Sequence, residues 1–345
     1  MSSPDELYAV IHDEVSRVLV GQDHLVKRLT VSFLTEGHIL LEGVPGVAKT
    51  TLANLFARVT GLEYTRIQMT PDTLPADITG TTVYRQQTGE FELQRGPVFA
   101  NIVVADEINR ATPKTQSALL EAMEERTVSI EGETLDLPDP FMVIATQNPL
   151  EMDGTFALPE AQRDRFQLKL TVDVPDRADE REVVDRFDET PGLGPGTVEQ
   201  VVDTDALAAA RETVPEVHVS EDVREYILDL VAATRDHPDV EHGASPRASL
   251  AFLHASKATA ALEGREYVIP DDVKELAAPI LVHRLLLTTD ARLGDMSPEE
   301  IVADVLASVS PPSAKHAPEE SPVSADGGGS DREKTPDQSP DTDRD

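Results

Sequence analysis

The stretch Gly43-Val44-Pro45-Gly46-Val47-Ala48-Lys49-Thr50 decides the fold of this chain. It follows the apolar run 39–41 and precedes a segment with helical character that begins at Thr51. A glycine-rich turn between a strand and a helix suits a polyphosphate, because backbone N–H groups converge on the anion at the helix N-terminus. The sequence therefore predicts a phosphate-binding loop in an α/β protein, with residues 43–51 contacting a nucleotide.

Individual residues of this loop have predicted roles. In the P-loop pattern Lys49 reaches the β and γ phosphates, and Thr50 offers a hydroxyl to Mg²⁺. Gly43 and Gly46 permit unusual dihedral angles and a close approach of the backbone to the ligand. Ala48 stands where the pattern usually has a glycine, and we expect it to adopt the right-handed dihedral angles of a beginning helix. The alternative for these eight residues alone is a glycine-containing turn without chemistry.

Length and composition restrict the class of protein. A chain of 345 residues suffices for two domains with a sizeable core. The absence of cysteine excludes disulfides, Fe–S clusters and thiolate metal sites, and the nine histidines show no ligand spacing such as HExxH. The sequence has no long apolar run and no signal-like N-terminal segment. We therefore expect a soluble, cytoplasmic protein without membrane insertion.

The formal net charge of −34 is the most unusual feature of the composition. It argues against a large basic surface for nucleic acid. The acidity extends along the whole chain and lysine is scarce beside arginine, as in proteins from organisms with a salt-rich cytoplasm, where salt screens the repulsion. We therefore expect a halophilic source, a halophilic archaeon; the alternative is an ordinary acidic protein with an acidic tail.

A second motif, Asp106-Glu107, follows the continuous apolar run 102–105. Continuous apolarity is typical of a central parallel strand buried on both faces, and the C-terminal ends of such strands carry the chemistry of α/β sheets. We expect Asp106 to hold the Mg²⁺ shell through a water molecule, and Glu107 to orient and polarise the attacking water. The alternative, two acids that only solvate a strand end, is weakened by the P-loop upstream.

Further candidates lie around this centre. Asn148 follows the apolar strand 141–145 and is predicted to sense the γ-phosphate, although Asn148-Pro149 could be a simple turn. Arg163 and Arg165 lie on a short helix before a final strand, where an arginine can act as a finger in a neighbouring subunit; surface salt bridges are the alternative. Val20 and Gln22 are candidates for contact with the adenine ring, and a plain helix-joining role is the alternative.

The pattern of the chain predicts an order of parts. Residues 1–190 form a nucleotide-binding core, with an irregular segment at about 70–97 and a β-hairpin at 127–137. A Pro- and Gly-containing linker at 191–205 leads to an all-α domain at 206–310. Residues 311–345 are rich in proline, serine, glycine and acids, and we expect an acidic disordered tail.

Taken together, these motifs resemble the MoxR family of AAA+ ATPases. The matching stretches are residues 43–50, 74–80 (LPADITG), 96–99 (GPVF), 105–110 (ADEINR), 116–125 (QSALLEAMEE), 145–149 (ATQNP), 158–166 (LPEAQRDRF) and 243–248 (GASPRA). They extend over residues 18–290, and the family also has alanine before the loop lysine. The resemblance implies an α/β P-loop core with a parallel sheet and flanking helices, followed by an α-helical lid domain.

The resemblance also implies roles for single residues. Lys49 and Thr50 belong to Walker A, and Asp106 and Glu107 to Walker B. Asn148 is implied as sensor 1, Arg165 as the arginine finger and Arg247 as sensor 2, acting within its own subunit or on the next one. Arg163 stands where the family usually has an apolar residue, so the finger could be Arg165 alone or shared; we predict Arg165. Segment 70–97 corresponds to an insert in helix 2, and hairpin 127–137 precedes sensor 1.

As a function, the resemblance implies ATP hydrolysis with Mg²⁺ by a homo-oligomeric ring, a hexamer. Its implied role is chaperone-like remodelling of protein complexes or metal-centre insertion, with a von Willebrand factor A domain protein as partner. Two alternatives are a chelatase-like subunit and a motor associated with nucleic acid, of which the charge disfavours the second. A scaffold that binds ATP without hydrolysing it would need a degenerate Walker B motif, and Asp106-Glu107 is intact.

Overall fold

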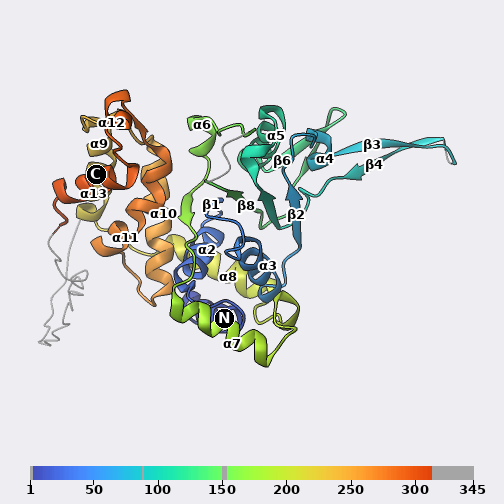
Figure 1. Ribbon diagram of the computed structural model, residues 1–345, viewed down its shortest axis with the longest axis horizontal. Helices are drawn as coiled ribbons and strands as arrows, with labels where there is room; N and C mark the ends of the chain where they lie inside the picture. The colour runs from blue at the N-terminus through green and yellow to red at the C-terminus, as the bar shows by residue number, and fades with distance from the viewer. Residues whose placement is uncertain (1–2, 88, 150–153, 313–345) are drawn as a thin grey trace, which may run out of the picture. The chain divides into compact units, whose positions relative to one another are not determined.

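A five-stranded parallel sheet forms the centre of the structure, which is a computed structural model describing residues 3–87, 89–149 and 154–312 (Figure 1). Apart from residues 311 and 312, the tail predicted at 311–345 lies outside the described residues. The strand order is β2-β5-β8-β1-β9. The strands are β1 (Ile39–Glu42), β2 (Tyr64–Gln68), β5 (Ile102–Asp106), β8 (Met142–Gln147) and β9 (Leu168–Thr171). The α/β fold class expected from the sequence is confirmed.

The sheet order places the predicted motifs at one edge. β5 is buried along its whole length and pairs in parallel with β8, as expected from their apolar runs. β1 lies between β8 and β9, so the chain order reverses there. A crevice forms outside the carboxyl ends of the strands at such a switch point. The loop after β1 and the acids after β5 therefore meet at this edge.

The two faces of the sheet are covered by different helices. Ile102 and Val104 of β5 belong to one buried cluster with α1 (Pro4–Ser16), α2 (Asp23–Leu34) and α3 (Lys49–Val59). Val103 and Ala105 belong to a second cluster with α5 (Pro113–Glu125). Because successive side chains of a strand point to opposite faces, both faces of β5 are apolar and both are covered.

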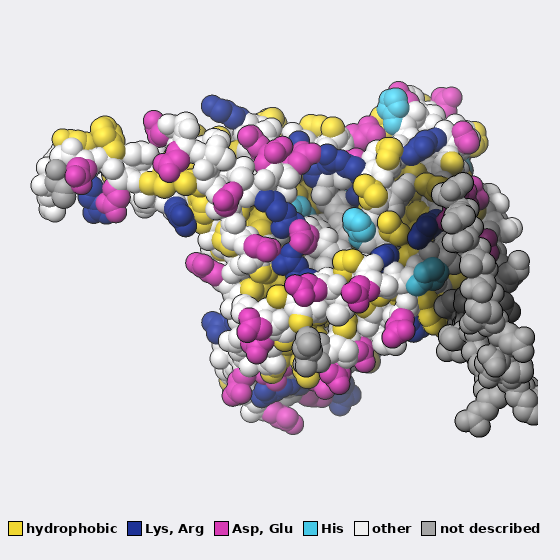
Figure 2. Space-filling model, turned by 180° about the vertical axis from the view of Figure 1, so that it is seen from behind, with side chains coloured by type: hydrophobic (Ala, Val, Ile, Leu, Met, Phe, Trp, Pro, Cys, Tyr) yellow, Lys and Arg dark blue, Asp and Glu magenta, His cyan; other side chains and the backbone are white. Residues whose placement is uncertain are grey.

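Two antiparallel hairpins interrupt this core. A short helix α4 (Pro75–Thr79) leads into β3 (Gly80–Arg85), which pairs with β4 (Glu90–Arg95). The second hairpin joins β6 (Thr127–Ile130) to β7 (Glu133–Asp136). The β3–β4 hairpin extends away from the sheet, and hydrophobic side chains gather at its far end, whereas acidic and basic side chains are interspersed over the face that Figure 2 shows.

The remaining elements are short connections and a helix-rich C-terminal region. They are η1 (Ile108–Arg110), α6 (Glu160–Arg163), α7 (Arg177–Glu189), η2 (Pro195–Thr197), α8 (Thr204–Thr213), η3 (Val214–Glu216), α9 (Glu221–Asp236), β10 (Val240–His242), α10 (Pro246–Leu262), α11 (Pro270–Leu281), η4 (Val282–Arg284), β11 (Leu286–Leu287), α12 (Thr289–Leu293) and α13 (Pro298–Ser308). The region is rich in helix as expected, and β10 pairs with β11 in a small antiparallel sheet that the sequence pattern did not predict. Strands of two and three residues are too short to show an alternating pattern in sequence.

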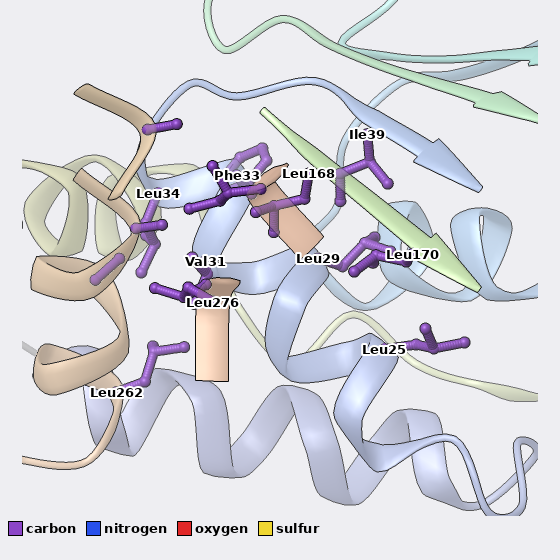
Figure 3. Packing of buried hydrophobic residues seen from close by; sticks show 14 of the residues in the cluster. Leu25, Leu29, Val31, Phe33, Leu34, Ile39, Leu168, Leu170, Leu262 and Leu276 are labelled. Atoms are coloured by element: carbon purple, nitrogen blue, oxygen red, sulfur yellow. The ribbon is translucent and has the colours of Figure 1, made fainter. Parts of the chain in front are cut away.

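The C-terminal helices share a hydrophobic cluster with the sheet. Figure 3 shows α2 between the two, with Phe33 near Leu168 and Leu29 near Leu170 of β9, and Val31 near Leu276 of α11. All of these side chains are buried. The C-terminal helices are therefore packed onto the core around the sheet through α2. Within the described residues, no helix has the length and apolarity needed to cross a membrane.

Candidate active site

The two glycines of the loop serve different purposes. Gly46 has φ +87° and open space around a would-be Cβ, so its requirement is the left-handed dihedral angle. A Cβ at Gly43 would lie 2.5 Å from the carbonyl oxygen of Val172, just after β9. Gly43 therefore permits a close approach of two backbone segments, and not an unusual dihedral angle as was expected for both glycines.

The expectation for Ala48 is wrong. Ala48 is the N-cap of α3 and has φ +61° and ψ +19°, which is the left-handed region and not the right-handed helical one. An L-residue with a Cβ pays about 1–2 kcal/mol for this conformation. This cost explains why glycine is usual at the position.

The loop, the acids and Asn148 line one cavity of about 410 Å³. Its lining consists of Pro45, Gly46, Ala48, Lys49, Thr50, Thr51, Arg66, Asp106, Glu107, Thr146 and Asn148. The Lys49 ammonium donates to the carbonyl oxygens of Gly43 and, at 3.2 Å, of Gln147 at the end of β8. Residues from three strands that are distant in sequence thus converge where the sequence predicted a nucleotide.

Asp106 is buried, with 8% of its surface exposed, and both of its carboxylate oxygens are engaged. Oδ1 accepts a hydrogen bond of 2.6 Å from the Thr146 hydroxyl. Oδ2 accepts from the guanidinium of Arg66, with 3.0 Å between Nε and Oδ2 and a second contact from Nη2. Charge-assisted bonds of this kind are strong and directional, and they fix the orientation of the carboxylate. Asp106 and Thr50, both oxygen donors, line the same cavity, which is the donor set that Mg²⁺ takes together with phosphates and water.

Glu107 lies just beyond β5 in a left-handed conformation, with φ +57°. Its backbone N–H donates to the Thr146 hydroxyl at 2.9 Å. Its Oε2 accepts from the Gln68 amide and from the Arg110 guanidinium, each at 2.9 Å. Glu107 is therefore held from both sides in a defined direction at the cavity, as a residue that orients a water molecule requires.

The other residues predicted to contact the nucleotide differ in whether they line this cavity. Asn148 is 5% exposed and lines the cavity. Val44 and Val47 are not among the lining side chains, and Val47 packs against the hydrophobic core instead. Val20 and Gln22 are not among them either. The Gln22 side-chain oxygen is buried and has no hydrogen-bond partner among the described residues. Such an orphaned acceptor suits a ligand amino group, and contact with adenine stays a prediction.

The predicted finger and sensor 2 arginines lie together, outside the lining of this cavity. Arg165 donates to the Leu120 carbonyl at 2.6 Å, and its Nη2 lies 2.8 Å from Glu124 Oε2. Arg247 contacts the other oxygen of Glu124. The hydrogen bond from Arg247 and the charge of Arg165 lower the pKa of Glu124, which keeps it ionised. Arg163 lies beside them in sequence, and its Nε is buried without a partner in the described part of the chain.

The comparisons with known proteins agree with this geometry. Residues 38–168 match the model of the ATPase family associated with various cellular activities (AAA), and residues 232–305 match the AAA lid domain. The chain is 47% identical to Chaperone MoxR1 of Mycobacterium tuberculosis, over 89% of this chain and 83% of that protein. It is 33% identical to Protein MoxR of Paracoccus denitrificans, over 79% and 86% of the two chains. The chain belongs to the MoxR family of AAA ATPases.

A solved structure supports the same assignment of the fold. A crystal structure from Cytophaga hutchinsonii, described as that of a candidate ATPase, superposes with a TM-score of 0.82 at 41% identity. The match covers 89% of this MoxR-family chain and 96% of the other. The two-part architecture of the described residues is therefore that of a solved relative.

Three residues of the MoxR-family site were missed in the sequence: Arg66, Gln68 and Thr146. Arg66 and Gln68 are two residues apart on β2. This strand pairs with β5 so that Gln68 is opposite Asp106. Thr146 precedes Gln147 at the end of β8, beside β5. The sequence did contain a clue: polar residues occur near the carboxyl ends of the strands that neighbour the strand ending in Asp106. Using it requires the strand order, which is a long-range property of the fold.

Proposed function

We propose that this MoxR-family chain hydrolyses ATP to ADP and phosphate, with Mg²⁺, at sites shared between adjacent subunits of a hexameric ring. The main supporting observation is that the charged groups lie in two separate places. One cavity collects Lys49, Thr50, Asp106 and Glu107, whereas Arg165 lies outside its lining. A finger that does not reach the cavity of its own chain is suited to act on the next subunit.

Within one chain, the loop amides and Lys49 bind the phosphates, because the helix N-terminus and the ammonium both favour negative charge. Thr50 and Asp106 are the residues that would hold Mg²⁺, with Asp106 acting through water. When bound, Mg²⁺ neutralises charge on the phosphate oxygens. Glu107 orients the attacking water and accepts its proton, and Asn148 contacts the water or the γ-phosphate.

The neighbour supplies the positive charge that the cavity needs in the transition state. Arg165 and Arg247 share the two oxygens of Glu124, so they are presented as a pair. An arginine supplied in this way is worth on the order of 10³ to 10⁵ in rate. We assign the finger to Arg165 alone, because Arg163 has no such partner among the described residues.

The proposed biological role is supported by the relatives and not by the cavity. One relative is named a chaperone. We propose chaperone-like remodelling of protein complexes or metal-centre insertion in the cytoplasm, with a von Willebrand factor A domain protein as partner. A chelatase-like subunit or a nucleic-acid-associated motor is the second candidate, and the net charge of −34 disfavours binding to nucleic acid.

The Glu107→Gln variant tests the proposed activity in buffer of high salt. It should retain ATP binding while Mg²⁺-dependent turnover falls at least about a hundredfold, because the water-orienting base is lost. Glu121→Gln, an exposed change on α5, is the matched control and should turn over normally. Near-normal turnover of Glu107→Gln would refute the assignment. An affinity pull-down with this variant and ATP would identify the partner class.

A further inference from the structure

Arg284 of η4 makes a buried polar contact between the C-terminal region and the core. Only 3% of Arg284 is exposed. Its Nε lies 2.8 Å from Asp164 Oδ1, and Nη2 donates to the carbonyl oxygens of Phe166 at 2.7 Å and Asp164 at 3.3 Å. Nη1 donates to the carbonyl oxygens of Gln167, at 3.2 Å, and Ile280. Each nitrogen of the guanidinium is thus engaged.

Two further groups of the C-terminal region hold the same segment. His283, also buried, directs Nε2 at the Phe166 carbonyl oxygen at 3.0 Å, so that nitrogen carries the proton. Ser245, the N-cap of α10, donates its hydroxyl to Asp164 Oδ2 at 2.8 Å and accepts from the backbone N–H of Arg247. The Asp164 carboxylate and the backbone carbonyls of residues 164, 166 and 167 are therefore bound from the C-terminal side.

Arg165 lies inside this bound segment. The partners of Arg284 include the residues immediately before and after Arg165, Asp164 and Phe166. Apolar side chains of similar volume would hold two domains together equally well, because burying an ion pair costs desolvation. A planar guanidinium with several fixed donors provides something different, namely a defined orientation of the groups that it binds.

We propose that Arg284 is a positioning residue for Arg165: it fixes the backbone on both sides of the finger and thereby sets where the finger guanidinium points. The inference rests on the proposed function, in which Arg165 acts in the site of the neighbouring subunit. Asp164 is the acceptor through which the C-terminal helices control the finger.

The test uses Arg284→Lys, which keeps the charge but replaces the fork with a single nitrogen that cannot span residues 164–167. Turnover of the homo-oligomer should fall about 10- to 100-fold, as displacement of a positioned group by about 1 Å implies. The ATP affinity, measured by calorimetry, should stay within about twofold, because the cavity of the same chain is untouched.

Mixing experiments show on which side of the interface the defect lies. Lys49→Ala subunits have a disabled cavity and an intact finger. In co-assembled oligomers they should restore turnover to Arg284→Lys subunits, so that the mixture exceeds the sum of the two variants. Absence of recovery, or normal turnover of Arg284→Lys alone, would overturn the proposal. Should Arg284→Lys fail to assemble, Asp164→Asn replaces it in the same mixture.

Two controls separate the possible failures. Arg265→Lys alters another arginine of the C-terminal region, whose Nη1 and Nη2 lie 2.9 and 2.6 Å from the Asp272 carboxylate. It should lower stability without changing turnover by more than about twofold; a turnover loss equal to that of Arg284→Lys would contradict a specific effect. The pair Arg165→Ala and Lys49→Ala tests the finger itself. Recovery in this pair alone refutes only the role of Arg284, whereas recovery in neither pair refutes both proposals.

Discussion

Replacing Thr146 with valine removes one hydroxyl from the centre of the site and leaves the shape of the side chain almost unchanged. Only 1% of Thr146 is exposed. Its hydroxyl donates to Asp106 Oδ1 at 2.6 Å and accepts from the Glu107 backbone N–H at 2.9 Å. In Thr146→Val both partners lose this bond at a buried position, so both acids of the Walker B motif lose their common anchor.

The cost follows from these two bonds. A buried amide left without an acceptor costs about 1–3 kcal/mol, and a bond to a charged group contributes about 1.5–3 kcal/mol. The added methyl returns about 0.8 kcal/mol. We therefore expect Thr146→Val to lower the free energy of unfolding by about 2–4 kcal/mol and to reduce turnover, since Glu107 is displaced.

Urea denaturation measures this loss as a shift of the midpoint at unchanged m-value. Thr259→Val is the matched control: Thr259 is fully buried in α10, and its hydroxyl has no hydrogen-bond partner among the described residues. Removing an unpartnered buried hydroxyl should be neutral or stabilise by up to about 1 kcal/mol. A loss below about 0.5 kcal/mol for Thr146→Val, or equal losses for both variants, would refute the reasoning.

Three further predictions concern Ala48, Gln68 and His38. Ala48→Gly should raise the free energy of unfolding by about 0.5–1 kcal/mol, because the relief of left-handed strain exceeds the entropy that glycine adds to the unfolded chain. Urea denaturation measures this change, and a loss of stability would contradict the prediction. Gln68→Ala should lower turnover about tenfold at unchanged ATP affinity, because Glu107 loses a hydrogen-bond partner. Steady-state kinetics measure the turnover and calorimetry measures the ATP affinity. Weakened ATP binding would contradict this explanation. Burial lowers the pKa of His38 from 6.5 to about 4. Between these two pH values His38 is protonated in the unfolded chain and neutral in the folded chain. Stability is thus complete above pH 6.5 and falls as the pH decreases toward 4, by up to about 1.4 kcal/mol per unit, and His38→Gln should flatten this slope; an unchanged slope would exclude His38 as its source.

The parts of the site that could be predicted are those encoded by local pattern. The loop 43–50 combines glycines, a lysine and a hydroxyl within eight residues, between a strand and a helix. Asp106-Glu107 ends a wholly apolar strand, and such a strand has to be central. These patterns were sufficient to place the acids beside the loop, because parallel strands end at a common edge.

The parts that were missed depend on contacts between segments far apart in sequence. Thr146 reaches Asp106 across 40 residues, and Asp164 finds Arg284 across 120. No spacing rule encodes such pairs, because strand order and helix docking create them. The error at Ala48 has a different origin: alanine favours right-handed helix, and the requirements of the loop outweigh this preference at one residue.

The most direct test of the central claim is the turnover of oligomers co-assembled from Arg165→Ala and Lys49→Ala subunits, each of which should be nearly inactive alone. If the finger acts on the neighbour, the intact cavity of an Arg165→Ala subunit is active when it receives the finger of an adjacent Lys49→Ala subunit. An equal mixture should then recover about one quarter of the wild-type turnover, because about one in four adjacent pairs has this order. No recovery, in oligomers shown to have co-assembled, would contradict a site shared between subunits.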